Sequence, residues 1–280
     1  MQHSMLEQPL VTEMAYWIME RYAIKERRAA GMEKPWSADP VFQRVRFCNV
    51  HREDDAVTRW IRTNWNKPTD QAWKFVLGRL INLPESLADI LDVVDIKSLS
   101  ECNRQLILRR ELGGKIFTSA YTISTCGRAM DKLDYVFGVV DDVRRLEESY
   151  ALNYDTCALL ANDLIDVDGL GSFLSAQIVA DMKNTVGHPL SNAPDFWTFS
   201  LPGPGSLRGL SWFFYGKSDC VTRTRYGYLL TKCREIVDPL VMGMTRISDQ
   251  DFQNCLCEFS KYMRATKDPS VRARNSFQGA

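Results

Sequence analysis

The apolar positions of this chain recur every three or four residues over long stretches, which is the pattern of amphipathic helices. The first such stretch covers residues 11–28. It places Met14, Ile18 and Tyr22 on one face, and a basic cluster and Gly31 follow where such a helix would end. The same pattern predicts further helices at 54–65, 69–81, 86–93, 98–110, 130–150, 154–164, 173–183, 221–237 and 248–263. We therefore expect an all-α, mainly helical fold.

Three segments fall outside this pattern. Residues 31–40 contain two prolines and are typical of a loop. Residues 115–124 are rich in β-branched and aromatic side chains and could be extended, a choice that periodicity leaves open. The end of the chain, residues 267–280, is polar, and we expect a flexible tail there.

The composition is that of a globular protein large enough to bury a core in one or two lobes. Hydrophobic residues make up 45% of the 280 positions. No apolar run approaches the roughly 18 residues of a membrane-spanning helix, and the polar start of the chain carries no export signal. The 35 Lys and Arg balance the 35 Asp and Glu, which argues against non-specific coating of polyanions but leaves room for a local basic patch.

The eight cysteines are scattered, and we expect free, buried thiols because the chain is large and lacks an export signal. Cys255 and Cys257 form a C-x-C pair that could ligate a metal. No second pair lies nearby and the chain has only three histidines, so no structural zinc site is expected. No cofactor is predicted either.

A glycine-containing turn between two apolar helices is the most informative short segment. Residues 164–180 read L-I-D-V-D-G-L-G-S-F-L-S-A-Q-I-V-A and resemble the helix-hairpin-helix motif. Glycines allow close approach, so that backbone N–H groups beside a helix start can bind a DNA phosphate without reading base sequence. The alternative is an ordinary turn. The predicted DNA contacts are Gly169, Leu170, Gly171 and Ser172.

The hairpin also resembles that of DNA glycosylases, which place a catalytic Asp shortly after it, in a cleft between two helical lobes. Asp195 lies 24 residues beyond Gly171, although it could instead be a helix cap after Pro194. No lysine follows the second glycine closely, so strand cleavage through a Schiff base is not expected. The expected domains are a central lobe, 51–183, ending in the hairpin, and a second lobe made of 1–50 plus 184–280.

Four blocks carry a more particular resemblance. They are F-C-N-V-H-R-E-D-D at 47–55, G-K-I-F-T-S-A-Y at 114–121, D-F-W-T-F at 195–199 leading into G-P-G-S-L-R-G-L at 203–210, and L-C-E-F-S-K-Y-M-R at 256–264. In this order they resemble the α-glutamyl/putrescinyl thymine pyrophosphorylases of phage DNA hypermodification, also described as amino acid:DNA transferases. That family is related to the helical domain of 5-hydroxymethyl-dU DNA kinases. Leu207 and Ser260 depart from its usual Arg and Asp, and no P-loop of a kinase is present.

The resemblance implies a transferase in a phage-infected bacterial cytoplasm. Its substrate would be double-stranded DNA with a pyrophosphoryloxy group on the 5-methyl of thymine, and the amine of an amino acid or polyamine would displace pyrophosphate. A 5-hmdU DNA kinase would act upstream. Expulsion of pyrophosphate calls for cations and amides, and the amine calls for a carboxylate base. Asp195 is the first candidate base and Glu258 the second, with Arg208 and Lys261 at the leaving group. The substrate-binding candidates are Asn49, Arg52, Asp55, Tyr121, Gly203, Gly205 and Arg264.

Each assignment has a structural alternative. Arg52 and Asp55 could belong to a helix cap and a surface charge cluster, and Arg208 could bind a DNA phosphate. Glu258 and Lys261 could form an ordinary surface ion pair. Tyr121 could be a core aromatic residue. At the level of function, the alternatives are a monofunctional glycosylase for a modified pyrimidine and a non-catalytic DNA-binding component of a hypermodification complex.

Overall fold

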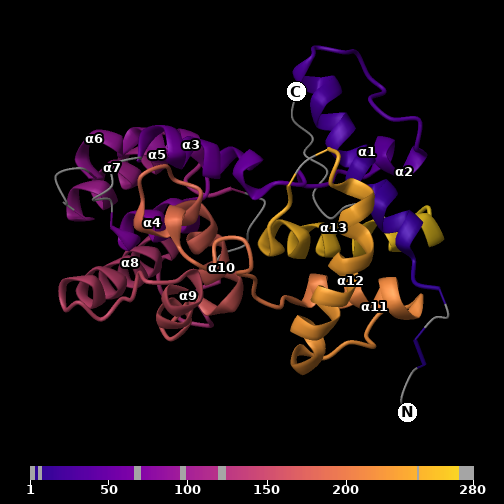
Figure 1. Ribbon diagram of the computed structural model, residues 1–280. Helices are drawn as coiled ribbons and strands as arrows, with labels where there is room; N and C mark the ends of the chain where they lie inside the picture. The colour runs from indigo at the N-terminus through magenta and orange to yellow at the C-terminus, as the bar shows by residue number, and fades with distance from the viewer. Residues whose placement is uncertain are drawn as a thin grey trace. The chain divides into compact units, whose positions relative to one another are not determined.

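The computed structural model describes residues 4–5, 8–65, 71–94, 99–118, 124–244 and 246–270. Within these ranges every regular element is a helix and no strand occurs, so the predicted all-α fold is confirmed (Figure 1). None of these helices is long and apolar enough to cross a membrane. The helices are α1 (Val11–Ala29), α2 (Pro40–Arg44), α3 (Ala56–Asn64), α4 (Ala72–Ile81), α5 (Pro84–Asp89), α6 (Leu91–Val94), α7 (Leu99–Glu111), α8 (Lys132–Glu148), α9 (Cys157–Ile165), α10 (Gly171–Lys183), α11 (Pro204–Tyr215), α12 (Tyr226–Val241) and α13 (Asp249–Lys267), with short 3-10 turns η1 (Arg52–Asp54), η2 (Pro189–Asn192) and η3 (Arg223–Arg225).

The observed helices follow the predicted ones closely, with three differences. The helix expected at 86–93 is divided at Ile90 into α5 and α6, and neither the short α2 nor α11 was predicted. In the segment whose conformation periodicity left open, residues 115–118 and 124 are irregular, and 119–123 lie outside the described residues. Of the expected tail, Lys267 ends α13, while 271–280 lie outside the described residues.

The chain divides into two compact units. Unit 1 comprises Met1–Arg52 and Ser200–Ala280, and unit 2 comprises Glu53–Phe199. Residues 184–199, which the sequence places with the chain ends, belong to unit 2. The first unit therefore contains α1, α2 and α11 to α13, and the second contains α3 to α10.

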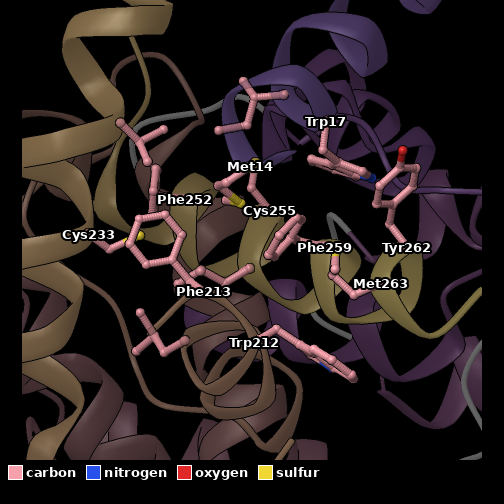
Figure 2. Packing of buried hydrophobic residues seen from close by; sticks show 14 of the residues in the cluster. Met14, Trp17, Trp212, Phe213, Cys233, Phe252, Cys255, Phe259, Tyr262 and Met263 are labelled. Carbon is pink, nitrogen blue, oxygen red and sulfur yellow. The ribbon is translucent and has the colours of Figure 1, made fainter. Parts of the chain in front are cut away.

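The core of unit 1 forms where α13 packs along α11. Phe252 and Phe259 of α13 are fully buried together with Phe213 of α11 and Met14 of α1 (Figure 2). Apolar side chains placed three or four residues apart on α13 produce this buried stripe. Burial of each large side chain contributes about 1.5–3 kcal/mol.

Two glycines allow α11 to approach α13 closely. A Cβ atom on Gly209 would lie 2.1 Å from the backbone oxygen of Leu256, and one on Gly205 would lie 2.1 Å from the Cys257 Sγ. Real Cβ contacts are not this short, so these positions require glycine. The third and fourth sequence blocks thus meet in one helix–helix contact.

Replacing Gly209 with alanine is therefore expected to destabilise the protein by about 1–3 kcal/mol, because the added methyl group forces α11 away from α13. The matched control is Gly138→Ala in α8, where a Cβ would meet nothing within 4 Å. That change should be neutral or stabilise the protein by up to about 1 kcal/mol through helix propensity. Urea denaturation of both variants measures the difference, and equal midpoints would refute the close-packing argument.

Unit 2 is organised around α4, whose residues Ala72–Ile81 are all buried, Arg79 included. The Arg79 guanidinium binds both oxygens of Asp181 on α10, with the Nε–Oδ2 distance at 2.7 Å. It also donates to Thr58 Oγ1 at 2.9 Å and to Asn82 Oδ1 at 3.1 Å. A buried charge needs such a complete set of partners. The network holds α3, α4 and α10 together.

Candidate functional site

Glu258 connects the first and fourth sequence blocks within unit 1. Its side chain is buried, its Oε2 accepts the backbone N–H of Cys48 at 2.9 Å, and Lys261 Nζ lies 2.8 Å from the same oxygen. Arg21, from α1, donates to the carbonyl oxygen of Cys48 at 2.9 Å and to the side-chain oxygen of Asn49. The predicted site residues Asn49, Glu258 and Lys261 therefore lie in one hydrogen-bonded cluster.

Arg208 brings the third block to this cluster. It lies on α11, three residues after Gly205, and acts electrostatically on Cys257, as Lys261 does. Burial and the neighbouring Glu258 raise the pKa of the Cys257 thiol to about 11, so the thiol is protonated at neutral pH and is not a nucleophile. All eight cysteines are free thiols, as predicted, but burial was predicted wrongly for Cys48 and Cys126, which are exposed. Within the described ranges no three His, Cys, Asp or Glu side chains form a group suited to a metal ion.

Gly203 and Gly205 lie at the start of a helix. Gly203 is the N-cap of α11, Pro204 is its first residue, and the Gly203 N–H donates to the Ser206 hydroxyl at 3.1 Å. The sequence analysis predicted no helix here because proline and glycine usually interrupt helices, whereas proline is favoured in the first helical turn. Gly205 is buried against Cys257.

Two of the predicted arginines have unsatisfied guanidinium nitrogens. Arg52 is only 5% exposed, and its Nε and Nη2 atoms are buried without a hydrogen-bond partner among the described residues. The Nε of the partly buried Arg208 is in the same situation. Leaving a buried charged donor unmatched is costly, so both arginines fit the role of anion ligands. The Arg52 backbone N–H, by contrast, donates to Asp251 at 2.8 Å.

Asp195 lies in unit 2 and caps a helix that precedes it in the chain. Its two carboxylate oxygens accept the backbone N–H groups of Cys157 and Ala158 at 2.8 and 2.9 Å, at the start of α9. The capped helix is α9, not one that follows Pro194. The Cys157 side chain also hydrogen-bonds to this carboxylate. An ionised carboxylate has about four acceptor positions, so about one remains for a substrate. Lys183, which the sequence analysis did not single out, is buried nearby and donates to the carbonyl oxygen of Phe196 at 2.8 Å.

Asp55, like Asp195, caps a helix. Its Oδ1 caps α3 by accepting the N–H groups of Val57 and Thr58, each at 3.1 Å, and lies 3.3 Å from the Arg79 Nη1. Whether it also contacts a substrate stays a prediction. Tyr121 lies outside the described residues.

The predicted hairpin is a tight turn between α9 and α10. Leu170 is buried and donates its N–H to the carbonyl oxygen of Val167 at 3.1 Å. Gly169 has a φ of +96°, and a Cβ there would lie 2.4 Å from the Tyr135 hydroxyl, so this position requires glycine. Ser172 follows in the first turn of α10. DNA contact by this turn stays a prediction.

The sequence analysis missed Arg21, Arg79 and Asp181. A signal was present for the last two. Arg79 is one of only two charges in the apolar helical run A-W-K-F-V-L-G-R-L-I, and Asp181 is the single charge in Q-I-V-A-D-M. Charged residues are seldom fully buried unless paired, so two such positions indicate a buried ion pair. Arg21 is a buried residue of α1, but this helix carries several other charged residues, so the local pattern does not distinguish Arg21 from them.

The fold and the site define an all-helical protein in which the first, third and fourth sequence blocks meet around α13. A family model of the helical domain of 5-hmdU DNA kinase matches residues 8–271. The chain therefore belongs to the family of this helical domain, and the relation predicted from the sequence blocks is confirmed. No curated protein and no solved structure gives a significant match. The family relates the chain to enzymes of thymidine-related DNA hypermodification.

Proposed function

We propose that this protein is an amine:DNA transferase that acts on 5-pyrophosphoryloxymethyl-uracil in phage DNA. The amine nitrogen of an amino acid or polyamine bonds to the 5-methylene carbon, and the carbon–oxygen bond to pyrophosphate breaks. The electron pair of that bond leaves with pyrophosphate, and a carboxylate takes the proton of the amine. The family supports a role in DNA modification, and the four sequence blocks support the type of transfer.

The observation that carries this proposal is the state of Arg208. Its guanidinium has a buried Nε without an acceptor and makes no ion pair with a described carboxylate, and Lys261 acts on the same neighbouring thiol. An arginine in this state suits an anion that is more strongly charged in the transition state than in the substrate. Departing pyrophosphate is an anion of this kind. Arg52, Arg264 and the first turn of α11 at Gly203 and Gly205 are further candidates for binding it.

The proton of the amine is assigned to Asp195, with Glu258 as the second candidate. Asp195 retains about one free acceptor position and is partly exposed, whereas Glu258 is buried and already binds Lys261 and the Cys48 N–H. A base must reach its proton within hydrogen-bond distance, which favours the more accessible carboxylate.

The test is nucleoside mass analysis of duplex DNA that carries the pyrophosphorylated base, after incubation with the full chain and a panel of amines including glutamate and putrescine. Transfer predicts a base heavier by the amine and one pyrophosphate released for each base changed. A lost base would instead show a glycosylase, and an unchanged base together with DNA binding would show a non-catalytic component.

Arg208→Ala is expected to lower the turnover number on the order of 10²-fold, because one donor to the departing anion is removed. Arg208→Lys should retain part of the activity, since it keeps the charge and loses the planar donor geometry. The charge-matched control is Arg59→Ala, which removes an exposed arginine of unit 2 whose side chain has no described partner. Equal turnover of the Arg208→Ala and Arg59→Ala variants would remove Arg208 from the mechanism.

A further inference from the structure

Formal charge is divided unevenly between the two units. Unit 1 contains 20 Lys and Arg against 13 Asp and Glu, a net charge of +7, and unit 2 contains 15 against 22, a net charge of −7. The opposite net charges of the two units cancel over the whole chain, so the overall composition does not reveal the difference between the units. The phosphate backbone of DNA is a dense line of negative charge that binds cations. It is therefore attracted to unit 1 and repelled by unit 2.

Several cations of unit 1 gather where α13 packs against the segment that follows α2. Arg44 donates to the carbonyl oxygen of Ala265, and Lys261 Nζ lies 3.4 Å from the carbonyl oxygen of Arg46. Arg264 follows Lys261 by three residues and so lies on the same side of α13. We define the α13 basic patch by the residues Arg44, Arg46, Lys261 and Arg264.

Two arginines of the α13 basic patch are available to a ligand. Arg46 and Arg264 are exposed, and neither side chain makes a hydrogen bond or ion pair with any residue that the structure describes. The nearby Glu258 is buried and already bound by Lys261, so it does not neutralise them. Exposed guanidinium groups without acid partners present paired donors that match phosphate oxygens.

The hairpin of unit 2 offers the opposite environment. The hollow beside it has a volume of about 440 Å³ and is lined by Asp142, Asp166 and Asp168, with Arg145 the only cation among its described lining residues. Asp168, on the turn itself, is paired with Arg128. A phosphate placed at this turn would meet carboxylates in addition to the backbone N–H groups. The negative charge around the hairpin therefore disfavours tight binding of DNA there.

We infer that the α13 basic patch binds the phosphate backbone of duplex DNA and contributes more to the electrostatic binding free energy than the hairpin does. This inference rests on the proposed function only in taking DNA as the substrate. Contacts to phosphates position a duplex without reading its sequence. The patch therefore binds DNA of any sequence and holds it beside Arg208, on the adjoining face of unit 1.

The experiment measures binding of the full chain to an unmodified duplex, without an amine donor, over a range of salt concentrations. Arg46→Ala combined with Arg264→Ala should weaken binding and reduce the slope of log affinity against log salt by about 2, or about one for each lost phosphate contact. The control removes two exposed cations of unit 2 that have no described side-chain partner, through Arg59→Ala with Lys115→Ala. That variant should keep the parental slope.

A third variant tests the hairpin directly. Gly171→Asp adds a carboxylate where a Cβ would meet nothing within 4 Å, and Asp tolerates the φ of +54° better than most residues. We expect a smaller loss of DNA affinity from Gly171→Asp than from Arg46→Ala combined with Arg264→Ala. In addition, ultraviolet cross-linking of the unaltered protein to DNA should give cross-linked peptides from 40–50 and 256–267 rather than from 164–175, which requires no variant to fold.

Equal slopes for the two double variants, a loss of binding confined to Gly171→Asp, or cross-links confined to the hairpin would each overturn the inference. Because the duplex carries no modified base, the result is independent of amine transfer. Patch-dependent binding without transfer would refute the proposed reaction alone, and transfer without patch-dependent binding would refute this inference alone.

Discussion

Arg79→Ala is expected to lower the free energy of unfolding by about 3–5 kcal/mol, because it leaves the Asp181 carboxylate buried without its cation. Both side chains are 0% exposed, so water cannot replace the lost partner. The change also removes the donor to Asp55 at the start of α3 and the donor to Asn82 at the end of α4. Urea denaturation of the full chain, followed by circular dichroism, measures the loss.

Two controls separate a buried charge from a lost contact. Arg104→Ala breaks the exposed pair with Glu101 and should leave the urea midpoint close to that of the parent, because solvent screens such pairs. Arg79→Met combined with Asp181→Leu removes both charges and should recover most of the stability. If the Arg79→Ala midpoint matched that of Arg104→Ala, the network would not be what holds α3, α4 and α10 together.

Helical periodicity was sufficient to predict most of the fold, because an apolar stripe every three or four residues is a local property. Periodicity did not predict α11, because the residues at the start of this helix are ones that usually interrupt helices. Gly205 and Gly209 disfavour a helix by intrinsic propensity, and a proline such as Pro204 is accepted only in the first turn. The packing of α11 against α13 compensates for this low propensity, because only glycine allows the backbone of Leu256 to come so close. Tertiary packing outweighs propensity there, and a single sequence does not reveal the partner helix.

The candidate site was predictable as a set of residues but not as an arrangement. The blocks identified Asn49, Arg208, Glu258 and Lys261, yet the Cys48 N–H and its acceptor Glu258 are separated by 210 positions in the chain. No periodicity connects positions so far apart. The sequence also concealed that Glu258 is committed to a buried ion pair and that the Arg208 Nε lacks an acceptor. These facts depend on burial, which appears only in the folded protein.

Asp195→Asn is expected to reduce the turnover number about 10²–10⁴-fold, the usual effect of removing a positioned general base. Asparagine keeps the size of the side chain and can still accept one of the two N–H groups at the start of α9. Its amide nitrogen can neither accept the second N–H group nor take a proton from the amine. DNA affinity should remain at the parental level, because the α13 basic patch is unchanged. Single-turnover assays on pyrophosphorylated duplex DNA measure the rate.

The role of Asp195 as a cap makes a second variant necessary. Thr156→Ala removes another cap of the same helix, since the Thr156 hydroxyl accepts the Leu159 N–H at 3.0 Å. Its expected cost in stability is about 1 kcal/mol, comparable to the loss of one N–H acceptor in Asp195→Asn. Thr156→Ala should nevertheless retain most of the parental turnover, because no base is lost. Similar rate losses in the two variants would show that Asp195 acts by holding α9 in place. In that case Glu258→Gln becomes the variant that must abolish amine transfer.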